Sequence, residues 1–345
     1  MHRQNRSMIA VILLLPVVIA LALWAFTWPS ARLAPRDLPV GVAGPANATA
    51  QLEKQFAARD GAFEVTAYED ESAARTAIQE RDIYGAVVAT PDGPKVLTAS
   101  AASPTVAQLL TAAVQEQAGP DAGRVAVDDV VAAPAADPRG AALNSSVLPL
   151  ALAGVAAGAL VTLTGLRGRR AIAALLGGTA LVGLVAAGLA HSWLGIVDGN
   201  WWAEAGAFAL TALAGGAGVA GFAALLGTRG IGVGALFVVL LGNPFSGVTS
   251  APELLPEPAG LIGQWLPPGA GGTLLRSVAF FDGNAIAAPL VTLGVWVAVG
   301  LTMVGLGAAR AKRRPGAMSS VTSGGQNKQQ DTEEVRSSSA LADAT

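Results

Sequence analysis

The sequence predicts a polytopic α-helical membrane protein of six spans, with a small extracytoplasmic α/β domain inserted after the first span. Two observations predict this fold class. Of the 345 residues, 52% are hydrophobic and 13% are charged, a balance too apolar for a soluble protein of this size. Uncharged runs that reach the ~20 residues needed to cross a bilayer as a helix occur both before and after one long charged stretch.

The orientation follows from two apolar runs, at 146–166 and 171–193, which are separated by a basic turn. Arg167, Arg169 and Arg170 lie in this turn, and short loops rich in Lys and Arg stay on the cytoplasmic side of a membrane. We therefore expect a helical hairpin with its turn in the cytoplasm and both outer ends outside the cell.

The first span is predicted at 8–28. Basic residues precede this run, and Trp24 and Trp28 lie at its far end, which predicts an inside-to-outside span with an aromatic anchor. The alternative is a cleaved signal peptide, because the segment SARLA offers a small-residue cleavage site. The run is longer than the ~7–15 residues of a signal core, which favours a retained span.

The charged stretch has the pattern of a small α/β domain. Strands are predicted for LPVGVAG, FEVTAY, IYGAVVAT, KVLTAS and RVAVDDVV, and helices for 46–58, SAARTAIQERD and 104–117. The order strand, helix, strand, helix, strand, strand, helix, strand indicates a mixed sheet. Both ends of this domain enter spans from outside, so we expect the domain to be extracytoplasmic.

The later spans contain many small residues. Gly154 and Gly158 have the GxxxG spacing, and the span at 205–226 contains GGAGVAG. Small faces let helix backbones approach closely in a membrane. The alternative is that glycine is scattered here by composition.

The fifth apolar segment, at 230–242, is shorter than the others. About a dozen strongly apolar residues reach only ~18 Å as a helix, which is less than the hydrocarbon thickness. Asn243 and Pro244 then interrupt the segment, because proline disfavours helix at the residue before it. Irregular backbone at membrane depth needs protein or a cavity around it, so we expect a short span followed by a re-entrant or interfacial segment at 243–284.

These predictions give the following organisation. The chain comprises a cytoplasmic N-terminus at 1–7, a first transmembrane helix at 8–28, an extracytoplasmic α/β domain at 29–145, a transmembrane domain at 146–309 and a disordered cytoplasmic tail at 310–345. The spans of the transmembrane domain are 146–166, 171–193, 205–226, 230–242 and 285–307.

The residue types argue against an enzyme, a metalloprotein or a nucleic-acid-binding protein. Cysteine is absent, which excludes disulfides and thiolate sites, and His2 and His191 are too far apart to predict a metal cluster. Asp128 and Asp129 point to opposite faces of a strand, and the acidic run at 69–71 is expected to cap the following helix. The net charge of -2 is spread along the chain. We predict no catalytic residue, cofactor, metal or nucleic acid.

Candidates for a substrate path are few. No charged residue lies inside the predicted spans, although such residues mark ion-coupled carriers. Asn243 and Pro244 are candidates because the helix break frees backbone groups. Thr162 is a second candidate, although such hydroxyls more often bond their own helix. Trp296 either lines a cavity or packs against protein.

Three charged residues between the fifth and sixth spans are also relevant. Glu253, Glu257 and Arg276 follow the helix break. We expect them to lie outside, in the headgroup zone, rather than to form a site.

The chain resembles ABC-2-type permeases, in particular the YhgE/Pip-like branch, over residues 8–309. The resemblance is carried by the order of elements, by DESAARTAIQERDIYGAVVA in the outer domain, and by GNPFSG, APELLP and WLPPGAGGTLLR before the last span. It implies an exporter half, usually dimeric, that moves lipids, polymers or drugs outward and has no catalytic residues. It also implies a separate ATPase subunit, for which the short inner turn offers little docking surface.

Two functions of different class follow. The first is a permease subunit in the cytoplasmic membrane that exports a hydrophobic or amphipathic compound, as a homo- or heterodimer in contact with the lipid bilayer. The alternative is a non-transporting cell-envelope protein whose extracytoplasmic domain binds a partner, a wall polymer or secretion machinery. A soluble-type enzyme fits least well, because no grouping of nucleophile, base and orienting residue is present.

Overall fold

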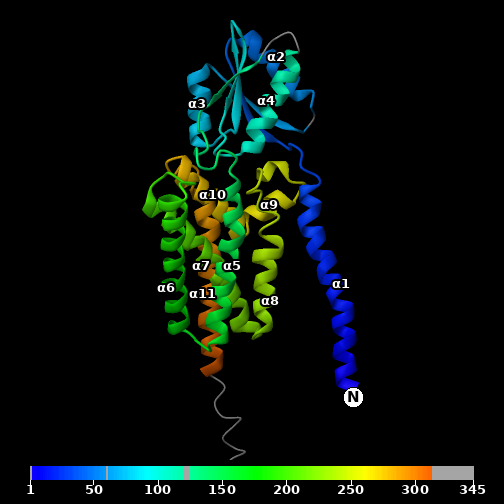
Figure 1. The fold of residues 1–345 in the computed structure, drawn as a ribbon, viewed down its shortest axis with the longest axis vertical. Coiled ribbons are helices and arrows are strands. Elements are labelled where there is room, and N and C mark those ends of the chain that lie inside the picture. Colours follow the sequence, from blue (N-terminus) through cyan, green and yellow to red (C-terminus); the bar gives the residue numbers. More distant parts are fainter. Residues whose placement is uncertain (1, 60, 120–123, 313–345) are drawn as a thin grey trace, which may run out of the picture.

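The structure is a computed structural model that describes residues 2–59, 61–119 and 124–312. Figure 1 shows an α/β domain at one end of the molecule and long helices that run away from it. The tail predicted at 310–345 lies outside the described residues from 313 onward.

The α/β domain contains one mixed sheet with the strand order β2-β1-β3-β4-β5. Strand β1 pairs in parallel with β2 and β3, β3 pairs antiparallel with β4, and β4 pairs in parallel with β5. The strands are Leu38–Ala43 (β1), Phe63–Tyr68 (β2), Gly85–Thr90 (β3), Gly93–Thr98 (β4) and Ala126–Asp129 (β5), and the helices are Ala46–Ala57 (α2), Glu71–Glu80 (α3) and Pro104–Ala118 (α4). The predicted order of strands and helices is confirmed.

Helices cover both faces of the sheet, and the apolar run of β3 is buried on both sides. Ala86 and Val88 of β3 pack with Ile78 of α3, whereas Val87, between them, packs with Leu110 of α4. Successive side chains of a strand point to opposite faces, so one buried strand serves two cores.

The acidic residues of the domain have structural partners. The carboxylate of Asp70 caps α3 by accepting a hydrogen bond of 2.8 Å from the Ala73 backbone N–H, as predicted for the acidic run. Hydrogen bonds from Lys95 and Arg75 lower the pKa of Glu71, and the same two cations lie against Asp128. This cluster joins α3 to β4 and β5 at the surface.

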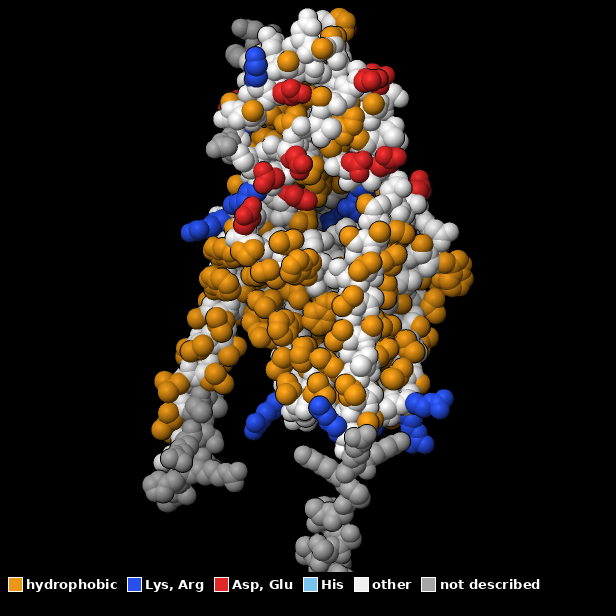
Figure 2. All heavy atoms as spheres, turned by 180° about the vertical axis from the view of Figure 1, so that it is seen from behind, with side chains coloured by type: hydrophobic (Ala, Val, Ile, Leu, Met, Phe, Trp, Pro, Cys, Tyr) orange, Lys and Arg blue, Asp and Glu red, His pale blue; other side chains and the backbone are white. Residues whose placement is uncertain are grey.

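Within the described residues, five helices are long and apolar enough to cross a membrane, by length and composition. They are α1 (His2–Ser30), α5 (Ala141–Leu163), α6 (Arg169–Ala187) with the π-helical turn η2 (Gly188–Trp193), α7 (Trp201–Leu226) and α11 (Ala287–Lys312). Figure 2 shows a broad band of hydrophobic side chains over this part of the molecule. A polytopic membrane protein is therefore confirmed at this level.

The predicted fifth span corresponds to a shorter helical segment. Helix α8 (Arg229–Ala235) continues into the π-helical turn η3 (Leu236–Leu241), and together they form the shorter apolar helix at 229–241. The helix ends before Asn243 and Pro244, where the sequence predicts a break. The next elements are η4 (Pro252–Leu254), α9 (Ala259–Gln264) and α10 (Pro267–Phe280), which lie at the end of the helices nearest the α/β domain (Figure 1).

Helix α7 is the centre of the helical part. It packs against α5, α6, α10 and α11, and 61% of its apolar window is buried. A Cβ atom at Gly158 of α5 would lie 2.6 Å from the backbone oxygen of Gly216, and one at Gly154 would lie 2.9 Å from that of Ala212. These glycines are therefore required for close helix packing, which decides against a purely compositional explanation.

Candidate binding pocket between the α/β domain and the helices

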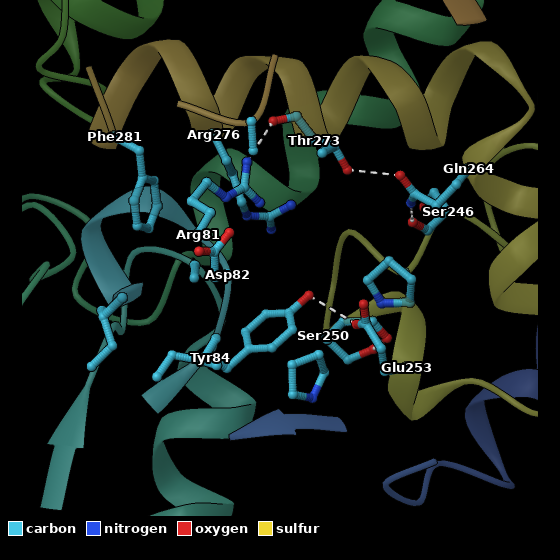
Figure 3. A pocket seen from close by; sticks show the side chains of 18 residues that line it. Arg81, Asp82, Tyr84, Ser246, Ser250, Glu253, Gln264, Thr273, Arg276 and Phe281 are labelled. Atoms are coloured by element: carbon cyan, nitrogen blue, oxygen red, sulfur yellow. Dashed lines mark hydrogen bonds between the residues drawn. The ribbon is translucent and has the colours of Figure 1, made fainter. Parts of the chain in front are cut away.

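A polar cavity of about 220 Å³ lies where the α/β domain meets the helical part. Its walls come from the loop between α3 and β3, from the loop after η3 and from α10 (Figure 3). The charged and polar side chains that line it are Arg81, Asp82, Tyr84, Ser246, Ser250, Glu253, Gln264, Thr273 and Arg276. Segments that are far apart in the sequence therefore form one site.

Arg81 links the α/β domain to α10. It ends α3 in a left-handed conformation, with φ of 67°. Its Nη1 donates hydrogen bonds to the backbone oxygen of Thr273 at 3.0 Å and to Oγ of Ser277 at 2.5 Å. The guanidinium carbon lies 5.0 Å from the centre of the Phe281 ring, which is within cation–π range. Burial lowers the pKa of Arg81 because it disfavours the charged form.

Arg276 of α10 lies beside this link and is buried, with 7% of its surface exposed. Its Nη2 donates a hydrogen bond of 2.7 Å to Oδ1 of Asn144 at the start of α5, and a second one to the backbone oxygen of Val248. Arg276 is thus enclosed by protein rather than exposed to the headgroup zone as predicted. The reason is that α10 packs beneath the α/β domain, so that its polar side faces protein.

Tyr84 and Glu253 form another wall of the cavity. The Tyr84 hydroxyl donates a hydrogen bond of 2.9 Å to Oε2 of Glu253. Burial and the neighbouring carboxylate raise the pKa of Tyr84, which keeps the phenol protonated as a donor. Glu253 is half-buried. The element that carries it, η4, folds against the α/β domain through a 3.0 Å bond from the Arg36 backbone N–H to the Glu253 backbone oxygen. Glu257 is exposed.

Gln264 of α9 fixes the remaining wall. Its Nε2 donates to the backbone oxygen of Ser246 at 2.8 Å, and its Oε1 accepts from Oγ1 of Thr273 at 2.8 Å. The side chain thus joins the loop after η3 to α10. This network holds the cavity walls in place from the side of the helices.

The four residues predicted from the sequence as a substrate path do not line this cavity. Thr162 donates to the Gly158 backbone oxygen at 2.8 Å, within its own helix. Trp296 packs against Gly218 and donates to the Trp265 backbone oxygen at 2.8 Å. The backbone oxygen of Asn243 accepts a hydrogen bond from Oγ of Ser246. Pro244 lies in the same turn after η3. Their role in a path stays a prediction.

A buried carboxylate was missed by the sequence reasoning. Glu204 has no exposed surface, and its Oε2 lies 2.9 Å from Nδ1 of His191, while its Oε1 accepts a 2.8 Å bond from the Gly199 backbone N–H. The span was predicted to begin at 205, whereas α7 begins at Trp201. The expectation that the spans hold no charged residue is therefore wrong for this helix. Asn200, which caps α7, was the available signal.

The stretches that carry the family resemblance meet at the cavity. Arg81 and Tyr84 belong to DESAARTAIQERDIYGAVVA, Ser246 to GNPFSG, Glu253 to APELLP and Arg276 to WLPPGAGGTLLR. Segments that looked unrelated in the sequence therefore share one place in the fold.

The comparisons with known proteins bear on the first part of the chain. No curated protein and no solved structure matches the chain. The family model described as ABC-2 family transporter protein matches residues 6–133, which comprise α1 and the α/β domain. Permeases of this family are membrane components of transporters that normally work with an ATPase partner. Over these residues, the match confirms the predicted resemblance to ABC-2-type permeases.

Proposed function

We propose that this chain is the membrane subunit of an exporter that moves a hydrophobic or amphipathic compound, such as a lipid, polymer or drug, out across the cytoplasmic membrane. The observation that carries this proposal is an apolar groove of about 530 Å³ between α5 and α6. It extends from Ala142 and Leu194, near the α/β domain, to Gly178 within α6. Leu181 and Val185 on its wall are 63% and 61% exposed, so the groove faces the bilayer, from which an apolar compound can enter.

We place residues 29–145 outside and both chain ends in the cytoplasm, with a short span at 230–242 and a re-entrant segment at 243–284. The distribution of charge supports this orientation. Exposed arginines lie at the end of the helices opposite the α/β domain (Figure 2): Arg167, Arg169, Arg170, Arg229 and Arg310. Trp193 and Trp202, near the other end, are 75% and 72% exposed. Basic residues favour the cytoplasmic side, and tryptophans favour the interfaces.

We further propose a dimer that works with a separate ATPase, and membership of the YhgE/Pip-like branch. The turn between α5 and α6 is short, at 164–168, so an ATPase has to contact several short segments at the basic end. A cavity of about 310 Å³ at this end is lined by residues of α5, α7 and α11.

Neutral substitutions in the basic turn test the orientation. Replacing Arg167, Arg169 and Arg170 with Gln should give a mixture of orientations, because the charge bias between the two sides decreases. Reporter fusions placed in the α/β domain and after α11 measure this. Thr162→Val is the control and should leave the fusion signals unchanged, since its hydroxyl bonds only its own helix. Unchanged signals in the triple variant would show that this turn does not set the topology.

Filling the groove tests export. Val185→Trp should lower efflux of the exported compound in cells, because the indole occupies the space between α5 and α6. Val291→Trp on α11 is the matched control: Val291 is 66% exposed and does not line the groove. If deletion of the gene leaves efflux of hydrophobic compounds unchanged and no ATPase copurifies, the proposal fails. The non-transporting envelope protein is then the better explanation.

A further inference from the structure

We propose that the cavity between the α/β domain and α10 binds an oxyanion, such as the phosphate or carboxylate head of an amphipathic compound. The inference deepens the proposed function and rests on it, because it assigns a negatively charged head to the exported compound. Two arginines, Arg81 and Arg276, carry the inference, together with the cavity that they line.

Neither arginine has a carboxylate partner. Among the residues that the structure describes, no Asp or Glu lies within salt-bridge distance of Arg81 or Arg276. Arg75, which lies in the α/β domain like Arg81, differs because it is paired with both Glu71 and Asp128. Arg276 is buried and Arg81 is half-buried. A cation withdrawn from water without a salt-bridge partner is costly, so an anion in this cavity would stabilise the arrangement.

The two positive charges are also close to each other. Arg81 reaches α10 at Thr273 and Ser277, which flank Arg276 along that helix, and Figure 3 shows both guanidinium groups at the same wall of the cavity. Adjacent like charges repel each other, most strongly when they are shielded from water. An oxyanion between them would replace this repulsion by two attractions.

The guanidinium groups keep donors for such a ligand. Neutral acceptors of the protein engage only Nη1 of Arg81 and only Nη2 of Arg276 among the described residues. In the described part of the chain, Nε and Nη2 of Arg81 therefore have no hydrogen-bond partner. This edge of a guanidinium binds a carboxylate or a phosphate through two parallel hydrogen bonds.

The acidic residues of the cavity offset these charges only in part. The charge of Glu253 acts on Arg81, but its Oε2 is bonded to Tyr84 rather than to a guanidinium. Asp82 is exposed, where water screens its charge. The volume of about 220 Å³ is below the ~300–1,000 Å³ of pockets that enclose a drug-sized ligand. The cavity therefore suits a head group and leaves the apolar part of the compound outside.

Titration calorimetry on the full-length protein in a neutral detergent tests the proposal with two probes. Inorganic phosphate represents a free anion, and dihexanoylphosphatidic acid represents a lipid head group; dihexanoylphosphatidylcholine is the probe without net charge. We expect at least one anionic probe to bind and the zwitterionic one to bind at least about tenfold more weakly. Binding of phosphate alone identifies a free anion as the ligand, and binding of the lipid alone identifies a head group.

Two substitutions with opposite expected effects make the test specific. Arg81→Gln should weaken anion binding at least about tenfold, because it removes one charge and the bidentate edge. Glu253→Gln retains the acceptor for Tyr84 but removes a nearby negative charge, so it should tighten binding by about fivefold. Arg75→Gln, in the exposed cluster, is the matched control and should leave the affinity unchanged. Size-exclusion profiles verify that each variant is folded.

The arginines would be only structural links if neither anionic probe binds, or if Arg81→Gln and Glu253→Gln both leave the affinity unchanged in folded protein. Failure of the anion site is distinguishable from failure of the proposed export function. Anion binding without any change in efflux on deletion would retain this site and refute export. Export that depends on the groove without anion binding would retain the exporter and refute this site.

Discussion

Helices α1 and α7 are similarly apolar, but they have different surroundings. Their apolar windows have mean hydropathies of 2.2 and 1.8, yet 11% of the window is buried in α1 and 61% in α7. Helix α1 presents large side chains to its surroundings, such as Leu13, which is 66% exposed. Helix α7 is rich in Ala and Gly and is enclosed by its neighbours. Hydropathy thus predicts that a helix enters the membrane, whereas side-chain size predicts whether it contacts protein or lipid.

The largest effect is expected where a bulky side chain is introduced against α7. Gly158→Leu should destabilise the protein by about 3 kcal/mol or more, because the new side chain meets backbone atoms of α7 that cannot move aside. Thermal unfolding in detergent, followed by fluorescence, measures this. Gly177→Leu on α6 is the matched control, since a Cβ there meets no atom within 4 Å. Equal stability of the two variants would refute the close packing of α5 on α7.

An intermediate effect is expected at the start of α7. Glu204→Ala should lower stability by about 1–3 kcal/mol, because the half-buried His191 and Gly199 backbone N–H lose the buried carboxylate that they contact. Unfolding midpoints measure the loss. Asp198→Ala, at an exposed position in the same loop, is the control and should change stability little. A Glu204→Ala variant as stable as the parent protein would mean that water reaches the contact between His191 and Glu204.

The smallest effect is expected on α1. Leu13→Ala should change the unfolding free energy by less than about 0.5 kcal/mol, because the side chain makes few contacts within the chain. The same unfolding assay applies. A loss comparable with that of Glu204→Ala would show that α1 packs against protein, for which a second copy of the chain is the natural candidate.

The fold of the α/β domain could be predicted because its signals are local. Alternating apolar residues, the capping residue Asp70 and the turn at 91–94 lie within or beside the elements that they specify. The apolar helices were predictable for the same reason. The ends of these helices were harder to predict. Glu204 lies between the polar residue Asn200 and an apolar run, and only the structure shows that it belongs to the first turn of α7.

The cavity could not be predicted, because its walls are brought together by tertiary contacts. Arg81 and Arg276 are far apart in the sequence, and each resembles an ordinary surface residue when considered alone. A weak signal was present: Arg276 is the one charged residue in the run PPGAGGTLLRSVAF. An isolated charge within an apolar helix needs a polar partner, but the sequence does not identify Asn144 as that partner.

The short turn between α5 and α6 has a consequence for biosynthesis. With only residues 164–168 between the two helices, the ribosome begins to deliver the second helix as soon as the first has emerged. The arginines at the turn resist translocation across the bilayer. We expect the pair to leave the translocation channel as a single unit, so that α7 finds two of its neighbours, α5 and α6, already inserted.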